Sequence, residues 1–249
     1  MMLSDAELDR YARHIILKEI GGAGQAQLTR ARVAVIGAGG IGSPAIQYLA
    51  AAGIGTLVVI DDDRVELSNL QRQTLFGDAD LGMPKVAAAA ATVAQLNPGV
   101  KVEQHAQRID AGNAAALLRS ADVVIDGCDN FATRLAVADA AARQRIPLVS
   151  AAVGQFEGQL AIYRPWEPER PCYRCLVGSD PDRPELSCAE AGVLGALTGV
   201  VGSLAALEAI RALVPFGDDP VGKLLLIDAL AFRFRTLALP RDPGCRCAG

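Results

Sequence analysis

The sequence predicts an α/β fold, a Rossmann-like and mainly parallel sheet with helices on both faces. Short apolar runs alternate with longer helical patterns through the first two thirds of the chain. A glycine-rich turn, VAVIGAGGIGS, joins the first apolar run to a long helical pattern. Alternation of this kind places helices over both faces of a parallel sheet, with ligands at the carboxyl ends of its strands.

The elements can be assigned in chain order. Residues 1–30 are expected to form an N-terminal helical extension, because Ser4 and Glu7 have the spacing of a capping box that opens a helix carrying Arg13 and His14. Residues 31–165 are expected to form a nucleotide-binding core. Its predicted elements are strand 33–36, helix 41–52, strand 56–60, helix 84–96, strands 100–105 and 123–125, helix 130–143, and strands 148–152 and 159–163.

Residues 166–249 depart from this alternation but belong to the same single domain of 1–249. Proline and cysteine become frequent, 178–186 is a polar crossover loop, and 223–239 suggests two more strands. Segment 191–207 contains no charged residue, yet it is at the lower limit for crossing a bilayer. Glycines recur in it at intervals of three and four, which favours a buried helix packed closely on a neighbour over a membrane span. They are Gly192, Gly195, Gly199 and Gly202.

The composition is that of a globular protein with an ordinary buried core. The chain has 249 residues, 51% of them hydrophobic and 21% charged, and a formal net charge of −4. A net negative charge does not favour binding to nucleic-acid phosphates, so we expect no nucleic-acid partner. The first ten residues carry acids where a signal peptide carries basic and then apolar residues. We therefore expect a cytoplasmic protein with reduced cysteines.

The glycine turn is the first candidate site. Gly37, Gly39 and Gly42 have the spacing of a tight turn that lets the backbone approach a phosphate at a helix N-terminus. Asp61 ends the next predicted strand, where a carboxylate can bind ribose hydroxyls. These residues predict an adenosine-bearing ligand. The alternative is a structural turn in a protein that has lost its ligand.

The segment after Asp61 favours ATP over NAD. Arg72, in SNLQRQ, and Lys85, at a helix start, can return two cations to the phosphate end of the sheet. Lys85 is one of four lysines against twenty arginines, although a solvated surface lysine is the competing interpretation. A hydride-transfer enzyme commonly needs an acid/base group such as histidine. The two histidines, His14 and His105, are expected to be structural.

The DGCDN segment places carboxylates after another predicted strand. Asp126 and Asp129 lie at the ligand edge of the sheet, and carboxylate oxygens suit a magnesium ion that bridges phosphates. The alternative is that Asp129 or Asn130 caps the next helix, and both roles can coexist.

The cysteines form the second candidate site. Cys172 and Cys175 make a C-x-x-C pair, and Cys245 with Cys247 makes a C-x-C pair, so together they supply four thiolates for a structural zinc ion. Unliganded thiols are the alternative. Cys188 stands apart before a predicted helix, where the helix dipole favours thiolate, and is either a nucleophile or inert. Cys128 follows a buried strand and is expected only to pack.

Several motifs then agree with one family. They are GAGGIGS, the acid Asp61, SNLQRQ, GMPK, DNFATR, PCYRC and SCAEAGV, in the family's order over nearly the whole chain. The sequence resembles the MoeB/ThiF family (HesA/MoeB/ThiF), bacterial relatives of ubiquitin-activating enzymes. The resemblance implies a homodimer that uses magnesium ATP to adenylate the C-terminal glycine of a small ubiquitin-like sulfur carrier ending in Gly-Gly, with release of pyrophosphate. A sulfur donor such as a cysteine desulfurase would act later, in molybdopterin, thiamin or another sulfur pathway.

The resemblance also implies residue roles. Gly40 and the turn would contact the nucleotide, Asp61 the ribose and Asp129 the magnesium, with Cys188 matching a cysteine that forms a covalent carrier intermediate in some members. Arg13 would reach the phosphates of the partner subunit. The phosphates and the rest of the nucleotide would be contacted by Asn69, Arg72, Gln73, Lys85 and Asn130.

One departure from the family concerns the last cysteine pair, which is one residue shorter than the usual C-x-x-C. Two other functions remain as alternatives. The first is a noncatalytic carrier-binding scaffold of the same fold, and the second is an NAD-dependent oxidoreductase.

Overall fold

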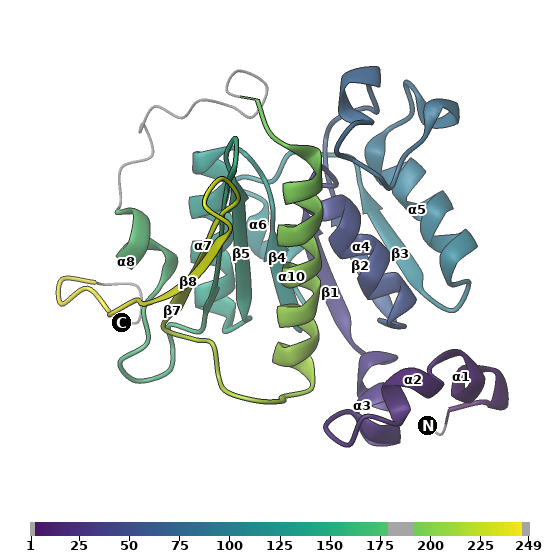
Figure 1. Ribbon diagram of the computed structural model, residues 1–249, viewed down its shortest axis with the longest axis horizontal. Helices are drawn as coiled ribbons and strands as arrows, with labels where there is room; N and C mark the ends of the chain where they lie inside the picture. Colours follow the sequence, from purple (N-terminus) through teal and green to yellow (C-terminus); the bar gives the residue numbers. More distant parts are fainter. Residues whose placement is uncertain (1–2, 179–191, 246–249) are drawn as a thin grey trace.

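A computed structural model describes residues 3–178 and 192–245 (Figure 1). Eight strands form one continuous sheet in the order β3-β2-β1-β4-β5-β6-β7-β8. The first five strands in this order are parallel and the last three pair antiparallel. The strands are β1 Arg32–Ile36, β2 Thr56–Ile60, β3 Lys101–His105, β4 Val123–Asp126, β5 Leu148–Val153, β6 Glu157–Tyr163, β7 Lys223–Asp228 and β8 Arg233–Ala238. The predicted Rossmann-like, mainly parallel sheet is confirmed.

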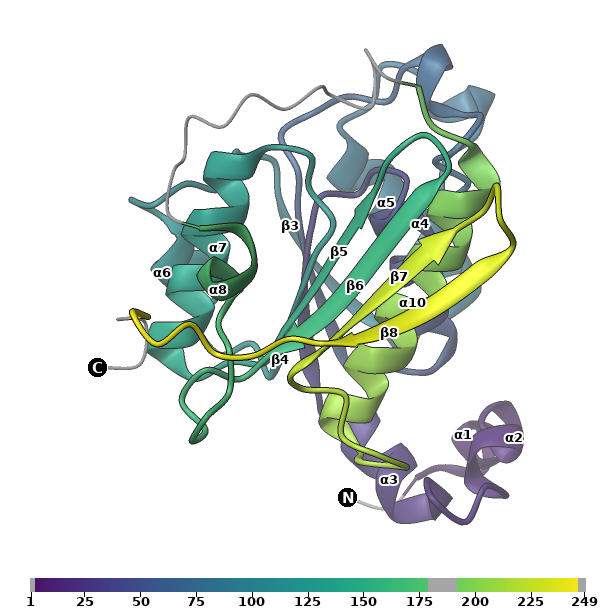
Figure 2. The same ribbon diagram turned by 60° about the vertical axis from the view of Figure 1, so that its left-hand side comes forward.

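Helices cover both faces of the sheet, as predicted (Figures 1 and 2). One face carries α4 Gly42–Ala51, α5 Lys85–Leu96 and α10 Gly195–Leu213, and the other carries α6 Ala114–Leu117, α7 Phe131–Gln144 and α8 Tyr173–Val177. Alternate side chains of a strand serve the two faces. In β1, Val33 and Val35 join the core under α4 and α10, whereas Ala34 and Ile36 join the core under α7. Burial on both faces explains why the central strands read as continuous apolar runs.

The N-terminal extension consists of α1 Asp5–Arg10, α2 Ala12–Ile15 and α3 Gly21–Leu28, at the amino ends of the parallel strands (Figure 1). The predicted capping box between Ser4 and Glu7 is present. The single helix predicted through Arg13 and His14 is wrong, because the chain leaves helical geometry at Tyr11. The buried Tyr11 hydroxyl accepts a hydrogen bond from Asn97 at 2.8 Å, and this long-range contact cannot be read from local sequence.

Helix α10 contains most of the uncharged segment 191–207 that raised the question of a membrane span, and its last turns carry Glu208 and Arg211. Within the described residues it is the one helix long and apolar enough to cross a bilayer, and 44% of its apolar window is buried in this fold. Two predicted close approaches exist: a Cβ at Gly195 would lie 2.3 Å from the Gln71 carbonyl, and one at Gly202 would lie 2.2 Å from the Ile41 carbonyl. The stripe is shorter than expected, since Gly192 precedes the helix and Gly199 faces open space. A packed core helix remains the better interpretation.

The C-terminal strands form an open edge of the sheet. Strands β7 and β8 form a hairpin, as predicted for 223–239, and every residue of β8 is exposed. Helix α8, which carries Cys175, lies beside α7 on the opposite side of the sheet from α10 (Figure 2). The predicted crossover loop lies almost entirely outside the described residues.

Candidate active site

A cavity of about 620 Å³ opens at the carboxyl ends of the parallel strands. Its wall is built from the segments that follow β1, β2 and β4 and from the first turns of α5, α7 and α10. Parallel strands bring their carboxyl ends to one edge of a sheet, so residues far apart in sequence meet there. The predicted site residues that line it are Gly37, Gly39, Gly40, Asp61, Asn69, Arg72, Gln73, Lys85, Asp129 and Asn130.

The glycine turn requires glycine at two positions. Gly37 has φ +83°, a conformation that residues with a Cβ rarely adopt. Gly42 lies outside the cavity lining, but a Cβ there would lie 1.9 Å from the Gly37 carbonyl oxygen. Gly42 therefore closes the turn, while Gly37, Gly39 and Gly40 leave its backbone open to the cavity.

Asp61 ties the end of β2 to the glycine turn. One carboxylate oxygen accepts the Ala38 N–H at 2.7 Å and the other accepts the Asp63 N–H at 2.8 Å. Burial raises the pKa of Asp61 above its ordinary value, and the nearby charge of Lys85 opposes that shift. Each oxygen keeps a further lone pair, so the carboxylate can still accept from ribose hydroxyls.

The SNLQRQ segment is held by its own backbone and by α10. Asn69 is buried, and its side-chain oxygen accepts the Glu66 N–H at 3.2 Å. The Arg72 guanidinium donates to the Ser68 carbonyl at 2.9 Å, which leaves other N–H groups for an anion. Gln73 is 3% exposed, and within the described residues its side-chain oxygen has no hydrogen-bond partner. These groups present polar atoms to the cavity.

Lys85 begins α5 and is 5% exposed, so the competing interpretation of a solvated surface lysine is wrong. Its ammonium nitrogen lies 2.8 Å from a carboxylate oxygen of Asp63. Lys85 and Arg72 therefore place two cations in the lining of the cavity, with the carboxylates of Asp61 and Asp63 beside them.

Asp126 and Asp129, the two carboxylates of the DGCDN segment, lie in different environments. Asp126 is 1% exposed and accepts hydrogen bonds from the backbone N–H and the thiol of Cys128, so it is structural. Asn130 caps α7 by accepting the Thr133 N–H at 2.9 Å. Asp129 is exposed and lines the cavity, which makes it the carboxylate available to a magnesium ion.

Cys128 packs against the core as predicted, although it also lines the cavity, and its half-buried thiol donates to Asp126 at 2.9 Å. Burial, followed by the Asp126 charge, raises the pKa of this thiol well above its ordinary value, so it is not a nucleophile.

Other predicted residues lie away from the cavity. Arg13 is exposed on α2, at the opposite end of the strands from the glycine turn within one chain (Figure 1). His14 bonds Gln25 at 3.0 Å, and neither it nor His105 is among the described residues that line the cavity. Cys188 lies outside the described residues.

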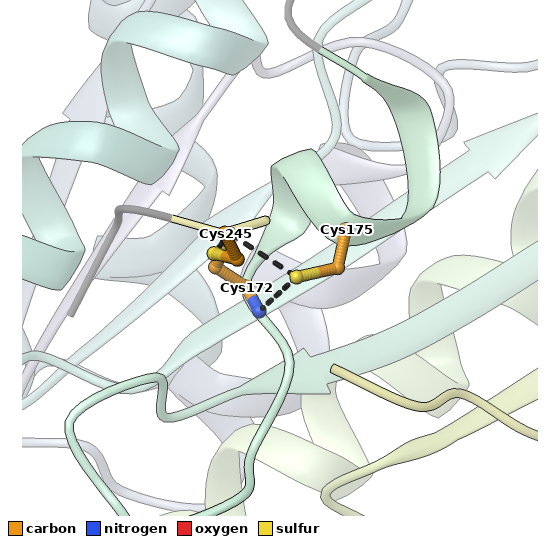
Figure 3. A group of neighbouring side chains, drawn as sticks. All are labelled: Cys172, Cys175 and Cys245. Carbon is orange, nitrogen blue, oxygen red and sulfur yellow. Dashed lines mark hydrogen bonds between the residues drawn. The ribbon is translucent and has the colours of Figure 1, made fainter. Parts of the chain in front are cut away.

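Three of the four predicted zinc ligands meet at one point (Figure 3). The sulfur of Cys172 lies 3.7 Å from that of Cys175 and 3.4 Å from that of Cys245. Four thiolates bound tetrahedrally at about 2.3 Å from zinc place their sulfurs about 3.8 Å apart, so this cluster fits the metal. Cys247 lies outside the described residues.

Sequence reasoning missed several residues of the cavity lining, among them Arg134 and Thr198. Arg134 is 6% exposed, lines the cavity, and donates to the carbonyls of Cys128 and Ala151. It stands in DNFATR, and its position one turn after the Asn130 cap is the signal that could have found it. Thr198 packs over Gly40 from the first turn of α10, and local sequence carries no signal for that contact.

The fold and cavity define a Rossmann-type nucleotide-binding protein. Residues 11–247 match the ThiF family. The chain is 47% identical to the sulfur carrier protein adenylyltransferase of Thermus thermophilus, covering 100% of this chain and 93% of that protein. It is 42% identical to the molybdopterin-synthase adenylyltransferase of Escherichia coli, covering 99% and 98%. The solved structure of E. coli MccB with ATP aligns with a TM-score of 0.82 at 25% identity, covering 96% and 74%.

The chain belongs to the ThiF family, and it is an adenylyltransferase. The resemblance inferred from the motifs is therefore confirmed, and the scaffold and oxidoreductase alternatives are set aside.

Proposed function

We propose that this enzyme adenylates the C-terminal glycine carboxylate of a small ubiquitin-like sulfur carrier, using magnesium ATP and releasing pyrophosphate. The observation that carries the proposal is the meeting of Asp61, Arg72, Lys85 and Asp129 on one cavity behind the glycine turn. The acid suits ribose, and the other three suit a triphosphate and its metal ion.

The chemistry needs alignment and charge neutralisation more than proton transfer. A carboxylate is already anionic at neutral pH, so its attack on the α-phosphorus requires no general base. The P–O bond to the β-phosphate breaks, and the growing negative charge on pyrophosphate must be neutralised. Arg72 and Lys85 are the cations available for that, and magnesium held by Asp129 would supply Lewis-acid neutralisation. The absence of both histidines from the cavity lining fits this reaction.

The carrier tail has a candidate path. A groove of about 460 Å³ shares Ala152, Val153 and Gln159 with the nucleotide cavity and continues over the antiparallel strands. Arg233 and Arg235 of β8 line its far end. An extended tail ending in Gly-Gly would lie along this groove and bring its carboxylate to the nucleotide.

The homodimer is also part of the proposal. An apolar groove of about 720 Å³ lies between α4, α10 and β8, and it contains the exposed side chains of Tyr48, Leu207 and Phe234. His14 lines the same groove, one residue after Arg13. A second copy seated there would bring Arg13 of α2 toward the partner's cavity. Phe234→Glu should then give a monomer by sedimentation, and an unchanged mass would remove this interface.

The cysteine cluster would hold a structural zinc ion through Cys172, Cys175, Cys245 and Cys247. Metal analysis should find one zinc per chain in the wild type and less in Cys172→Ser. A metal-free wild type would contradict the site. Cytoplasmic localisation and a cysteine desulfurase as sulfur donor complete the proposal, and fractionation of cells and co-purification test them.

One experiment tests the reaction itself. ATP–pyrophosphate exchange should appear only when a purified carrier ending in Gly-Gly and magnesium are both present, and a panel of molybdopterin-type and thiamin-type carriers would identify the cognate pathway. A carrier that lacks the last glycine is the matched control. Exchange at the same rate without any carrier would contradict the assignment.

A further inference from the structure

Two chain segments beside the cavity are joined by backbone pairing. The Lys85 N–H donates to the Asp63 carbonyl at 3.0 Å, and Arg64 forms an antiparallel bridge with Pro84. The Val65 N–H donates to the Met83 carbonyl at 2.9 Å. The extension of β2 therefore fixes the start of α5, and with it the base of the Lys85 side chain.

The same two residues are joined a second time through their side chains. The Lys85 ammonium lies 2.8 Å from the Asp63 carboxylate. The exposures differ: the Lys85 side chain is 6% exposed and that of Asp63 is 61% exposed. Removing the Asp63 carboxylate would break the direct ion pair of this buried ammonium and leave it only the attraction of the nearby Asp61 carboxylate. A weaker pairing of a buried charge favours either movement of the side chain into water or loss of its proton. Either change would withdraw the cation from the cavity.

We propose that Asp63 is a positioning residue for the adenylation reaction, because its carboxylate holds the Lys85 ammonium, charged, against the phosphate-binding wall. This inference rests on the proposed function, in which Lys85 neutralises charge on the phosphates. Asp63 lines the cavity, and its proposed role is to act through Lys85 rather than to bind the nucleotide directly. Nothing in the local sequence distinguishes it from its neighbours in IDDDRV, since three aspartates follow one another there.

The adjacent Asp62 provides a matched control. Its carboxylate lies within 4.8 Å of that of Asp63 but pairs with Arg108 at 3.1 Å, and both of those side chains are well exposed. Both aspartates line the cavity, so Asn at either position removes one negative charge from the same wall. Loss of a negative charge by itself favours binding of a triphosphate. Only Asp63→Asn also releases Lys85, so the difference between the two variants isolates positioning from bulk electrostatics.

The experiment measures carrier-dependent ATP–pyrophosphate exchange for Asp63→Asn and Asp62→Asn, with kcat and the KM for ATP determined separately. We expect kcat to fall about ten- to a hundredfold in Asp63→Asn, the scale for a misplaced catalytic group, and to change less than about twofold in Asp62→Asn. Asp63→Glu, which keeps a carboxylate, should recover part of the loss. Equal effects in the two asparagine variants would overturn the proposal.

A double-mutant cycle separates positioning from a general structural role. Because Asp63 acts through Lys85, Asp63→Asn should cost almost nothing further in a Lys85→Met background, and additive losses would overturn the proposal. Should the wild type show no exchange with any carrier, the proposed function fails, and calorimetry of ATP binding still tests the positioning. In that assay Asp63→Asn would weaken ATP binding and Asp62→Asn would not, and matching affinities would overturn the inference.

Discussion

The two halves of the sheet differ in how completely they are covered. Strands β1, β2, β4 and β5 are largely buried between helical layers, and their carboxyl ends meet at the cavity. Strand β8 at the antiparallel edge is exposed along its whole length, and Phe234 is 58% exposed. The covered half brings Asp61, Arg72, Lys85 and Asp129 of one chain to a single cavity. The uncovered half has an open edge, an apolar groove and a pair of arginines, which are features typical of association surfaces.

The difference suggests that the two halves of the sheet have different roles, with catalysis in the covered half and association in the uncovered half. Positioning reacting groups requires rigid surroundings, because a small displacement costs rate. Recognition surfaces can stay exposed until a partner covers them, and exposed apolar patches commonly mark such sites. Variants in the covered half should therefore act on the chemical step, and variants in the uncovered half on association.

The largest effect is expected from the cations of the covered half. Arg72→Ala or Lys85→Ala should lower carrier-dependent ATP–pyrophosphate exchange by about two to three orders of magnitude, the scale for removing a preorganised charge-stabilising contact. Both variants should fold, which circular dichroism checks. Near-normal exchange in both variants would contradict the prediction that Arg72 and Lys85 bind the phosphates.

A smaller effect is expected from the arginines of the uncovered half. Replacing both Arg233 and Arg235 with Ala should raise the KM for the carrier about three- to tenfold at low salt and leave the affinity for ATP unchanged, because charges at an interface rim mainly set the association rate. The effect should shrink as salt screens it. Arg143→Ala, an exposed arginine on α7 across the sheet, is the control. A loss confined to ATP affinity would contradict the tail path.

The two halves also differ in how well the sequence predicts them. Strand 56–60 has the predicted limits and the other parallel strands differ by one residue at an end, because strands buried on both faces read as apolar runs bounded by turns. Gly37, Asp61 and Lys85 line the cavity as predicted, because the spacing of the glycine motif and the ends of the predicted strands indicate the edge of the sheet at which a ligand binds. Antiparallel pairing of β6 with β5 and β7, the helix break at Tyr11 and the Asp63–Lys85 ion pair were missed. Each of these three features depends on contacts between separate segments of the chain, and a local sequence pattern does not specify which segments meet.

The smallest effect is expected from the contacts of Tyr173, which join helix α8 to α7 and β6. Tyr173, between Cys172 and Cys175, packs against Phe131 of α7. Burial raises the pKa of Tyr173, and its hydroxyl interacts with the charge of the buried Arg134, which opposes that rise. Tyr163 packs edge-on against Tyr173 with ring centroids 5.8 Å apart, but its buried hydroxyl has no hydrogen-bond partner in the described part of the chain. These two neighbouring phenols allow a matched pair of phenylalanine substitutions.

Tyr173→Phe should lower the free energy of unfolding by about 1 kcal/mol, the scale of one polar interaction lost at a buried site. Tyr163→Phe removes a hydroxyl that is buried without a partner, so it should be neutral or slightly stabilising. Denaturant unfolding of the zinc-loaded protein measures both. Because Arg134 also donates to the Cys128 carbonyl beside Asp129, Tyr173→Phe should in addition raise the magnesium concentration for half-maximal exchange, and Tyr163→Phe should not. Equal stabilities and equal magnesium requirements in the two variants would show that helix α8 packs against the catalytic half without influencing its geometry.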